Sequence, residues 1–558
     1  MGKRILLVMP TFWDVIAPPV GIISLKSYLE QYGHSVQTAN LNVNNKLWNT
    51  QHQYFRVLEN YVPNKSLVPR IGSEFLGLHL NAKVFEEEVP PQFFHDFLRM
   101  ALREKFLDLL NENTEEEMNR LVVEIDQVAT DHFKHVCEAI PDLLSVDPEF
   151  VGFTGFSSTY GTGLYMLKEI KRQNPSIKTI VGGSGPYNGF AHDSPNMTRL
   201  LETCTFVDQV IFGEGEQALK KYVEGDFKEG RLIHPFNLGL PSMNMDDLPI
   251  LDYSDVDLSK YFNLGVNTSR GCPFLCSFCS ETKSWGSFRR MSPDKTIEAV
   301  QAQVGKISGN SIFMTDSLFN QPITPFSKKA VEQGLDVNFD CYLRVDRFAE
   351  DPKYVDLWSK AGLSRVRFGM ESASPKMLEV MIKEITQSQM ENSLRTMGEA
   401  GIQTTTYWIV GHPHETEEDF QETLNFIHRN KDHIFEVDFA LFYFYGEGEI
   451  GKDDFTADFG GVERVFPEEY DPLSIFTYYK LKNPHPTRSE SFKRAVRFTA
   501  LMKEWGVPCN RASIMDLMTA EKRWQRLTGR GAAILPKSFG EGRDPSSTGN
   551  AVSSPEVV

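Results

Sequence analysis

Three cysteines follow one another closely in residues 268–281, where Cys272, Cys276 and Cys279 have the spacing C-x3-C-x2-C. Thiolates are the usual ligands of iron–sulfur clusters, and a cube-shaped 4Fe–4S cluster has four positions to fill. The segment from 280 to 340 contains no further Cys and no His, so the loop supplies three ligands. A structural zinc ion would need a fourth protein ligand. The pattern therefore predicts a cluster with one iron left open for a substrate or cosubstrate.

The residues around the cysteines narrow the interpretation. Cysteines can also be buried simply as small hydrophobic residues, but Gly271 and Pro273 favour a shaped loop over a packed helix. With Phe278 before the last cysteine, the motif resembles that of the radical S-adenosylmethionine enzymes. The resemblance implies a 4Fe–4S cluster whose open iron chelates S-adenosylmethionine and whose electron cleaves it to a 5′-deoxyadenosyl radical. It also implies an electron donor such as flavodoxin or ferredoxin.

Length and composition set outer limits on the function. At 558 residues the chain is long enough for two or three domains. A formal net charge of −17 argues against a nucleic-acid partner, because binding phosphate requires a basic surface. The longest apolar runs have the length of strands, so no membrane span is expected. The other four cysteines are scattered singly and form no disulfide framework, which favours a reducing cytoplasm. They are Cys137, Cys204, Cys341 and Cys509.

The first part of the chain, residues 1–235, alternates apolar strands with helices. This alternation predicts a doubly wound, parallel, Rossmann-like sheet. Five strands are expected at 4–9, 35–40, 149–155, 177–181 and 207–212, with helices at 22–32 and 161–173. Sheets of this kind bind ligands at the carboxyl ends of their strands, and those ends carry small residues that let a ligand approach the backbone. The small residues and one acid are Ser157, Ser158, Thr159, Gly182, Gly183, Gly213, Glu214 and Gly215.

Four short pieces of this domain resemble the cobalamin-binding domain of one large radical S-adenosylmethionine subfamily. They are Pro18–Gly21, Val151–Thr154, Val181–Gly183 and Gly213–Glu216. The resemblance implies that the strand-end residues, together with Ser184–Pro186, contact cobalamin. A flavodoxin-like domain without a ligand is the alternative. The D-x-H-x-x-G sequence that supplies a histidine ligand to cobalt in other enzymes is missing here, so cobalt is expected to lack such a ligand.

Residues 43–148 interrupt the first domain as a helical insertion, which we expect to cap it. Segments 90–111 and 114–144 have apolar residues at helical spacing. His132 and His135 are expected on a solvated face of the second helix. After the first domain, segment 236–262 lacks periodicity and is interpreted as a linker on the surface.

Residues 263–445 repeat a strand–helix unit six times, which predicts a partial (β/α)6 barrel. The expected strands are 264–267, 311–315, 337–343, 365–370, 404–410 and 437–444. Functional residues of such barrels lie at the carboxyl ends of the strands. The resemblance to the radical S-adenosylmethionine family implies that four residues at these ends contact S-adenosylmethionine. They are Asp316, Arg344, Glu371 and Ser372.

Beyond the barrel the sequence predicts a small, mostly helical region at 446–536, with helices at 489–505 and 513–528. The composition of 537–558 is that of a disordered tail.

The leading hypothesis for function is a cobalamin-dependent radical S-adenosylmethionine C-methyltransferase. Its substrate would be a natural product, a lipid or a peptide precursor with an unactivated carbon. A second hypothesis is radical chemistry without methylation, such as cyclisation, rearrangement, desaturation or epimerisation. An epimerase would need a hydrogen donor, for which Cys341 and Cys509 are candidates. A third is a non-catalytic carrier of a corrinoid or cluster, which the full set of strand-end residues disfavours.

Overall fold

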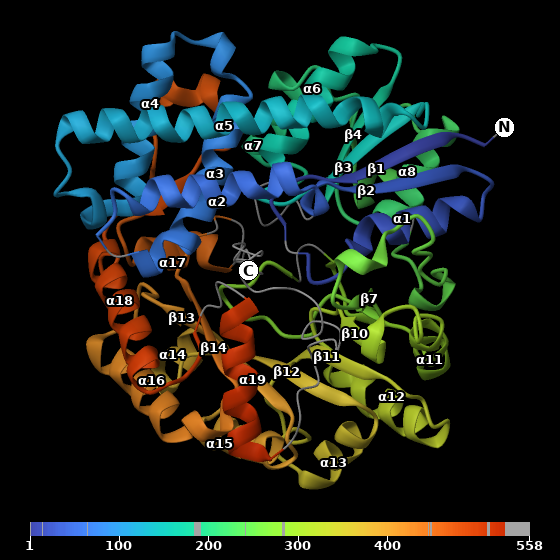
Figure 1. Cartoon of the computed structure of the whole chain (residues 1–558), viewed down its shortest axis with the longest axis vertical. Helices are drawn as coiled ribbons and strands as arrows, with labels where there is room; N and C mark the ends of the chain where they lie inside the picture. The colour runs from blue at the N-terminus through green and yellow to red at the C-terminus, as the bar shows by residue number, and fades with distance from the viewer. Residues whose placement is uncertain are drawn as a thin grey trace.

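Two six-stranded sheets organise the chain, one following the other in sequence. The computed structural model describes residues 2–529 except 14, 64, 184–190, 240, 282–284, 445, 447–448 and 510–513. Figure 1 shows the first sheet with its helices in blue to green in the upper part, and the second in yellow to orange below.

The first sheet is wholly parallel and has the strand order β2-β1-β3-β4-β5-β6. Its strands are β1 (Arg4–Met9), β2 (Ser35–Asn40), β3 (Phe150–Gly155), β4 (Lys178–Gly183), β5 (Gln209–Ile211) and β6 (Leu232–Ile233). The helices between them are α1 (Val20–Glu30), α6 (Tyr160–Gln173), α7 (Pro195–Thr203) and α8 (Gly215–Glu224). Strand order reverses at β1, so the predicted doubly wound sheet is confirmed. The short strand β6 was not predicted.

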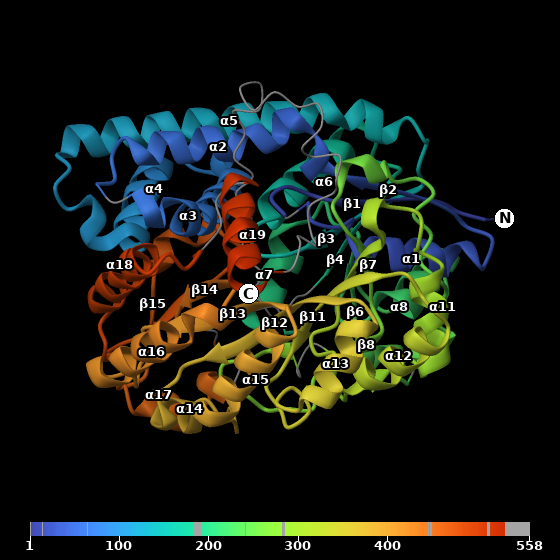
Figure 2. The same ribbon diagram turned by 60° about the horizontal axis from the view of Figure 1, so that its bottom comes forward.

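In its described residues the insertion contains four α-helices, which are α2 (Asn45–Glu59), α3 (Val68–Lys83), α4 (Pro91–Phe106) and α5 (Glu115–Leu144). Figures 1 and 2 both show α5 on the outer side of the molecule, away from the second sheet. The helices over 90–111 and 114–144 were predicted, and Thr114 and Glu117 cap α5 through mutual hydrogen bonds.

The expectation that His132 lies on a solvated face is wrong. The side chain is fully buried, with Nε2 3.0 Å from the hydroxyls of both Thr11 and Thr162. Burial lowers the pKa of His132 to about 3, so the ring is neutral at pH 7. The physical reason is helical spacing, because position 132 falls on the same buried stripe of α5 as Ala129 and Val136.

The second sheet is also parallel and has the order β14-β13-β12-β11-β10-β7. Its strands are β7 (Leu264–Val266), β10 (Ser311–Met314), β11 (Asn338–Leu343), β12 (Leu363–Glu371), β13 (Gln403–Val410) and β14 (Glu436–Leu441). The helices are α11 (Pro293–Gln301), α12 (Asn320–Glu332), α13 (Pro352–Lys360), α14 (Pro375–Val380), α15 (Gln387–Glu399) and α16 (Glu417–Asn430). In the described residues β7 and β14 are edge strands, so the predicted partial barrel is confirmed.

The first domain contacts both edges of this open barrel. At β7, a Cβ atom added to Gly265 would clash with the side chain of Val20 of α1, which shows how closely the two pack. At β14, Arg70 of α3 forms an ion pair of 2.7 Å with Asp438. The linker contributes to this packing, because Tyr253 is buried and donates a hydrogen bond of 2.7 Å to the carbonyl of Gly265. Its predicted course over the surface is therefore wrong in part.

The C-terminal region adds an antiparallel ribbon to the predicted helices. The ribbon pairs β15 (Val462–Arg464) with β16 (Tyr479–Leu481). The helices are α17 (Asp453–Ala457), α18 (Arg488–Glu504) and α19 (Ile514–Thr528). The predicted tail at 537–558 lies outside the described residues. Among the helices described, none is both long and apolar enough to cross a membrane.

Candidate active site

A cavity of about 1220 Å³ lies between the two sheets. The carboxyl ends of strands from both sheets open into it, together with the cysteine loop, one face of α3 and the C-terminal ribbon. The two sites expected from the sequence, one in each domain, thus share a single space.

The cysteine loop leaves the short strand β8 (Ser269–Arg270) through Gly271, whose φ of 81° is a left-handed conformation that favours glycine. The backbone N–H of Ser277 donates to the carbonyl of Met381 at 3.0 Å, which ties the loop to the segment after α14. All three cysteines line the cavity and are half-buried. Burial raises the pKa of the Cys279 thiol to about 11 and also raises that of Cys272. Since metal ligands bind as thiolates, cluster assembly should release protons.

The cysteines suit a cluster better than a single ion. In the described part of the chain, no group of three or more His, Cys, Asp or Glu side chains is arranged to hold one metal ion. Each thiolate of a 4Fe–4S cluster binds a different iron, so its cysteines lie farther apart than the ligands of one ion. Three thiols on one loop, all facing the same cavity, therefore fit a cluster.

Arg344, which follows β11, lies against the cysteine loop. Its Nη1 is 3.5 Å from the sulfur of Cys276, and its guanidinium carbon is 3.9 Å from the ring centroid of Phe274. Its Nη2 is buried and has no hydrogen-bond partner among the described residues. The positive charge therefore lies beside the sulfur of Cys276, and Nη2 leaves a donor for a bound cosubstrate.

Asp316, which follows β10, is fully buried and faces the start of the loop. Its Oδ1 accepts hydrogen bonds from the backbone N–H of Thr268 at 3.0 Å and from the hydroxyl of Ser269 at 2.5 Å. Its Oδ2 accepts none from the described residues. Burial raises the pKa of Asp316 to about 7, against the opposing effect of these hydrogen bonds. Asp316 thus anchors the loop through one oxygen and leaves the other for a cation.

Glu371 ends β12 and Ser372 follows it, and the two side chains have different positions. Glu371 lines the cavity with a φ of 65° and forms an ion pair of 3.0 Å with Lys383. The adjacent Ser372 is buried away from the cavity, with its hydroxyl 3.3 Å from that of Thr423 on α16. The structure brings Asp316, Arg344 and Glu371 together around the cysteines, and it does not bring Ser372 to them.

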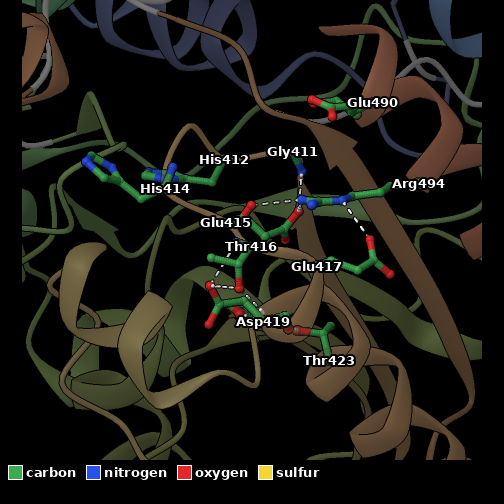
Figure 3. A network of polar contacts seen from close by, with 12 residues as sticks. Gly411, His412, His414, Glu415, Thr416, Glu417, Asp419, Thr423, Glu490 and Arg494 are labelled. Atoms are coloured by element: carbon green, nitrogen blue, oxygen red, sulfur yellow. Dashed lines mark hydrogen bonds and ion pairs between the residues drawn. The ribbon is translucent and has the colours of Figure 1, made fainter. Parts of the chain in front are cut away.

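The turn after β13 is held by a buried acid (Figure 3). Glu415 accepts hydrogen bonds from the backbone N–H of Gly411 at 3.0 Å and from Arg494 of α18 at 2.8 Å. Burial raises the pKa of Glu415 to about 7, although Gly411 and Arg494 act in the opposite direction. This network fixes the carboxyl end of β13 beside the cavity.

The glycine-rich strand ends of the first sheet form the opposite side of the cavity. Ser157, Ser158, Gly182, Gly183, Gly213, Glu214 and Gly215 line it. Thr159 does not, because its hydroxyl turns back to accept a hydrogen bond of 2.9 Å from the backbone N–H of Phe156. Segment Ser184–Pro186 lies outside the described residues.

Two neighbouring glycines on this side have different constraints. A Cβ at Gly183, where φ is 116°, would lie 2.5 Å from the backbone of Gly155. Among the described residues, a Cβ at Gly182 would meet only the carbonyl of Ile211, at 3.8 Å. Gly183 is therefore needed by the fold itself, whereas at Gly182 the space belongs to the cavity. An exposed glycine backbone beside a large cavity fits the approach of a bulky cofactor such as cobalamin.

Glu214 also joins the two domains. It accepts a hydrogen bond of 2.9 Å from Arg270, which stands two residues before Cys272, and forms a second ion pair of 2.9 Å with Arg289. Glu216 pairs with Arg270 at 2.5 Å. The predicted contact between Glu214 and cobalamin stays a prediction.

The sequence reasoning missed several cavity residues. Glu281 closes the cysteine motif itself, and its carboxylate accepts a hydrogen bond from Ser317, so its position in the motif was an available signal. Arg70, Glu74 and Lys105 of the insertion also line the cavity. They come from a segment interpreted only as a cap, and no motif marks them.

Comparison with known proteins gives a family match for the second domain. Residues 266–427 match the model of the radical SAM superfamily. This part of the chain therefore matches a radical SAM domain, which implies a 4Fe–4S cluster and S-adenosylmethionine as cofactors.

Solved structures extend the likeness to the whole fold. The radical S-adenosylmethionine methyltransferase TsrM of Kitasatospora setae, solved with cobalamin and a [4Fe-4S] cluster, has a TM-score of 0.58 at 15% identity. The match covers 89% of this chain and 91% of that one. The cobalamin-dependent radical enzyme OxsB has a TM-score of 0.51 at 16% identity, covering 91% of this chain and 62% of that one. These likenesses establish the fold.

Curated relatives match a smaller part. An uncharacterized methyltransferase of Pyrococcus horikoshii is 29% identical over 318 residues, which is 53% of this chain and 66% of the relative. The anaerobic magnesium-protoporphyrin IX monomethyl ester cyclase of Rubrivivax gelatinosus is 26% identical over 307 residues, 50% of this chain and 54% of the relative. The chain thus spans between half and two thirds of the length of these relatives.

Proposed function

We propose that the protein is a cobalamin-dependent radical S-adenosylmethionine methyltransferase that acts on a poorly activated carbon of a small molecule. The observation that carries the proposal is the shared cavity, which three cysteines line from one domain and glycine-rich strand ends from the other. The cobalamin-bound neighbours and the methyltransferase relative support the same assignment. When bound, the cluster, S-adenosylmethionine and cobalamin would supply the radical and the methyl group.

The chain's own residues would bind and orient these groups. Cys272, Cys276 and Cys279 would hold the cluster, with the positive charge of Arg344 beside Cys276. Asp316 would accept a hydrogen bond from the ammonium group of S-adenosylmethionine through Oδ2, which accepts none from the described residues. Gly182 would leave the backbone open to the corrin ring. Because the cavity lies between the domains, the reacting groups would be shielded from water.

The test is anaerobic purification with cobalamin, followed by reconstitution of the cluster and addition of S-adenosylmethionine and a reductant such as reduced flavodoxin. The expected results are corrinoid absorbance in the purified protein and formation of 5′-deoxyadenosine. A protein that forms 5′-deoxyadenosine without ever retaining a corrinoid would not be a cobalamin-dependent methyltransferase.

A second candidate is a radical reaction without methyl transfer, which the likeness to a cyclase favours. Product mass separates the two, because only methyl transfer adds a carbon. The epimerase variant finds no support in the cavity. Cys341 is fully buried on β11, and neither it nor Cys509 belongs to the lining described for the cavity.

A further inference from the structure

One face of α3 forms a polar wall of the cavity. The residues that line it recur at helical spacing, and they are Arg70, Ser73, Glu74, Gly77, Leu78 and Asn81. A helix inside a protein ordinarily turns an apolar stripe inward. Asn81 is 3% exposed, and its side-chain carbonyl accepts no hydrogen bond from the described residues. The polar side chains of this stripe therefore face whatever ligand occupies the cavity.

Two ion pairs dominate this wall, and their carboxylates are the accessible members. Glu74 pairs with Lys105 of α4 at 2.9 Å, and their side chains are 41% and 9% exposed. Asp438 of β14 pairs with Arg70 at 2.7 Å, with side chains 33% and 8% exposed. The wall is neutral in sum, and its carboxylates are more exposed than the cations that pair with them. An occupant of the cavity therefore meets carboxylate oxygens.

Among the described residues, each acid has hydrogen-bond partners on only one of its two carboxylate oxygens. Lys105 binds Oε2 of Glu74, while Arg70 and the backbone N–H of Phe439 bind Oδ1 of Asp438. Burial acts to raise the pKa of Glu74, but Lys105, Arg488 and Arg70 outweigh it and hold the pKa below its usual value. Glu74 is therefore ionised at neutral pH and presents a negative charge.

Aromatic rings surround the two carboxylates. The ammonium of Lys105 lies 5.3 Å from the ring centroid of Tyr443, and the guanidinium of Arg70 lies 4.5 Å from that of Phe439. Tyr478 of the segment before the ribbon strand β16 also lines the cavity. Rings beside ionised carboxylates attract a cation by its charge and by the cation–π effect, and they accommodate an apolar body.

We propose that Glu74 and Asp438, with Tyr443 and Tyr478, form the substrate subsite, and that the substrate is an amine, protonated at neutral pH, on an apolar or aromatic body. This inference rests on the proposed function, because it names the substrate class of the same cavity. A carboxylate or phosphate on the substrate would face like charges and be repelled.

The test compares three ligands that share one body and differ in charge, namely phenethylamine, phenethyl alcohol and hydrocinnamate. Binding to the reconstituted holoprotein is measured by anaerobic calorimetry with S-adenosylmethionine present in excess. We expect the amine to bind at least about tenfold more tightly than the alcohol, and hydrocinnamate to bind more weakly than either. Glu74→Gln and Asp438→Asn should each weaken amine binding roughly ten- to a hundredfold.

Two controls keep the result interpretable. Glu112→Gln makes the same chemical change on an exposed side chain outside the cavity and should leave amine binding unaltered. Because Glu74→Gln leaves Lys105 buried without its partner, the double variant Glu74→Gln/Lys105→Met removes both charges together and should still lose amine binding.

Three results would overturn the proposal. The first is that the amine binds no better than the alcohol, which includes the case that neither binds. The second is that amine binding survives Glu74→Gln and Asp438→Asn. The third is that S-adenosylmethionine displaces the amine. Formation of 5′-deoxyadenosine by the unaltered protein is measured on the same samples. A protein that cleaves S-adenosylmethionine but fails the amine test contradicts the subsite alone, whereas failure of cleavage contradicts the proposed function.

Discussion

The ion pairs between α8 and the cysteine loop should couple the two domains, and Glu216→Gln tests this coupling. Glu216 is 3% exposed and binds Arg270 through Oε1 at 2.5 Å and Oε2 at 3.2 Å. It also accepts a hydrogen bond of 2.9 Å from the hydroxyl of Ser24. Arg270 lies two residues before Cys272, so this pair holds the start of the loop against the first domain.

The expected loss of stability follows from the burial of the Glu216–Arg270 pair. Removing one member of a buried ion pair costs about 3–5 kcal/mol, because the other charge is left without compensation. Glu216→Gln should lower the free energy of unfolding by about 3 kcal/mol, near the lower end of this range. The reason is that glutamine still accepts hydrogen bonds and Glu214 still pairs with Arg270. The double variant Glu216→Gln/Arg270→Met buries no unpaired charge and should recover roughly 2 kcal/mol of that loss.

The pH dependence has a definite sign. Burial acts to raise the pKa of Glu216, but Arg270 outweighs it, so the pKa lies below its usual 4.5. The ionised form is thus favoured in the folded state, and its stabilisation is complete above pH 4.5 and is lost as the pH falls through the folded pKa. The difference between the unaltered protein and Glu216→Gln should therefore shrink in acid.

The assay is urea unfolding of the four members of the double-mutant cycle, followed by tryptophan fluorescence, with iron content as a second readout. Glu224→Gln is the matched control, because Glu224 is on the same helix α8 but forms a more exposed pair with Lys220. That change should cost about 0.5 kcal/mol or less. If the losses in free energy of unfolding of the two single variants simply add in the double variant, Glu216 and Arg270 are not coupled, and the predicted coupling of the two domains through this pair is wrong.

Three further predictions follow from the site. Alanine at any of the three cysteines of the loop should abolish iron binding and S-adenosylmethionine cleavage, whereas alanine at the buried Cys204 should leave the iron content unchanged. Asp316→Asn and Glu371→Ala should each weaken S-adenosylmethionine binding roughly ten- to a hundredfold in calorimetry. Because the pKa of Asp316 is about 7, binding by the unaltered protein should weaken below that pH, and Asp316→Asn should lack this dependence. Gly182→Val should block corrinoid uptake, measured by absorbance, with the iron content preserved, whereas Gly183→Val should lower the yield of folded protein.

Those parts of the fold that depend on local patterns could be predicted from the sequence. Apolar runs separated by helical periods identified both parallel sheets, and C-x3-C-x2-C identified the cluster loop before any packing was considered. Strand ends were placed well enough to find Asp316, Arg344 and Glu371, because parallel strands bring their carboxyl ends to one edge. These inferences need only the period of a strand or helix and the chemistry of a thiol.

The errors at single residues have a geometric reason. Glu371 ends β12 with a left-handed φ of 65°, so the chain turns there, and Glu371 reaches the cavity while Ser372 turns toward Thr423. Thr159 is adjacent to two residues that line the cavity, but its hydroxyl caps its own turn. A motif places such neighbours together, and only the backbone conformation decides which of them faces the ligand.

The wall formed by the insertion could not be predicted because its contacts are remote in sequence. Arg70 and Asp438 are 368 positions apart, and each alone resembles an ordinary surface charge. Their pairing depends on how the first domain is placed across the open edge of the barrel, which no local period records.

The position of α3 explains why this insertion matters to the reaction. At Gly77 the helix comes so close to the Ser157–Ser158 turn that an added Cβ would lie 3.3 Å from the Cα of Ser158. At Arg70, about two helical turns earlier, it reaches β14 of the barrel. Glu74 stands between these points, on the same face. A substrate amine held by Glu74 would therefore lie between the glycine-rich edge of the first sheet and the open side of the barrel, where a group from each domain can approach it.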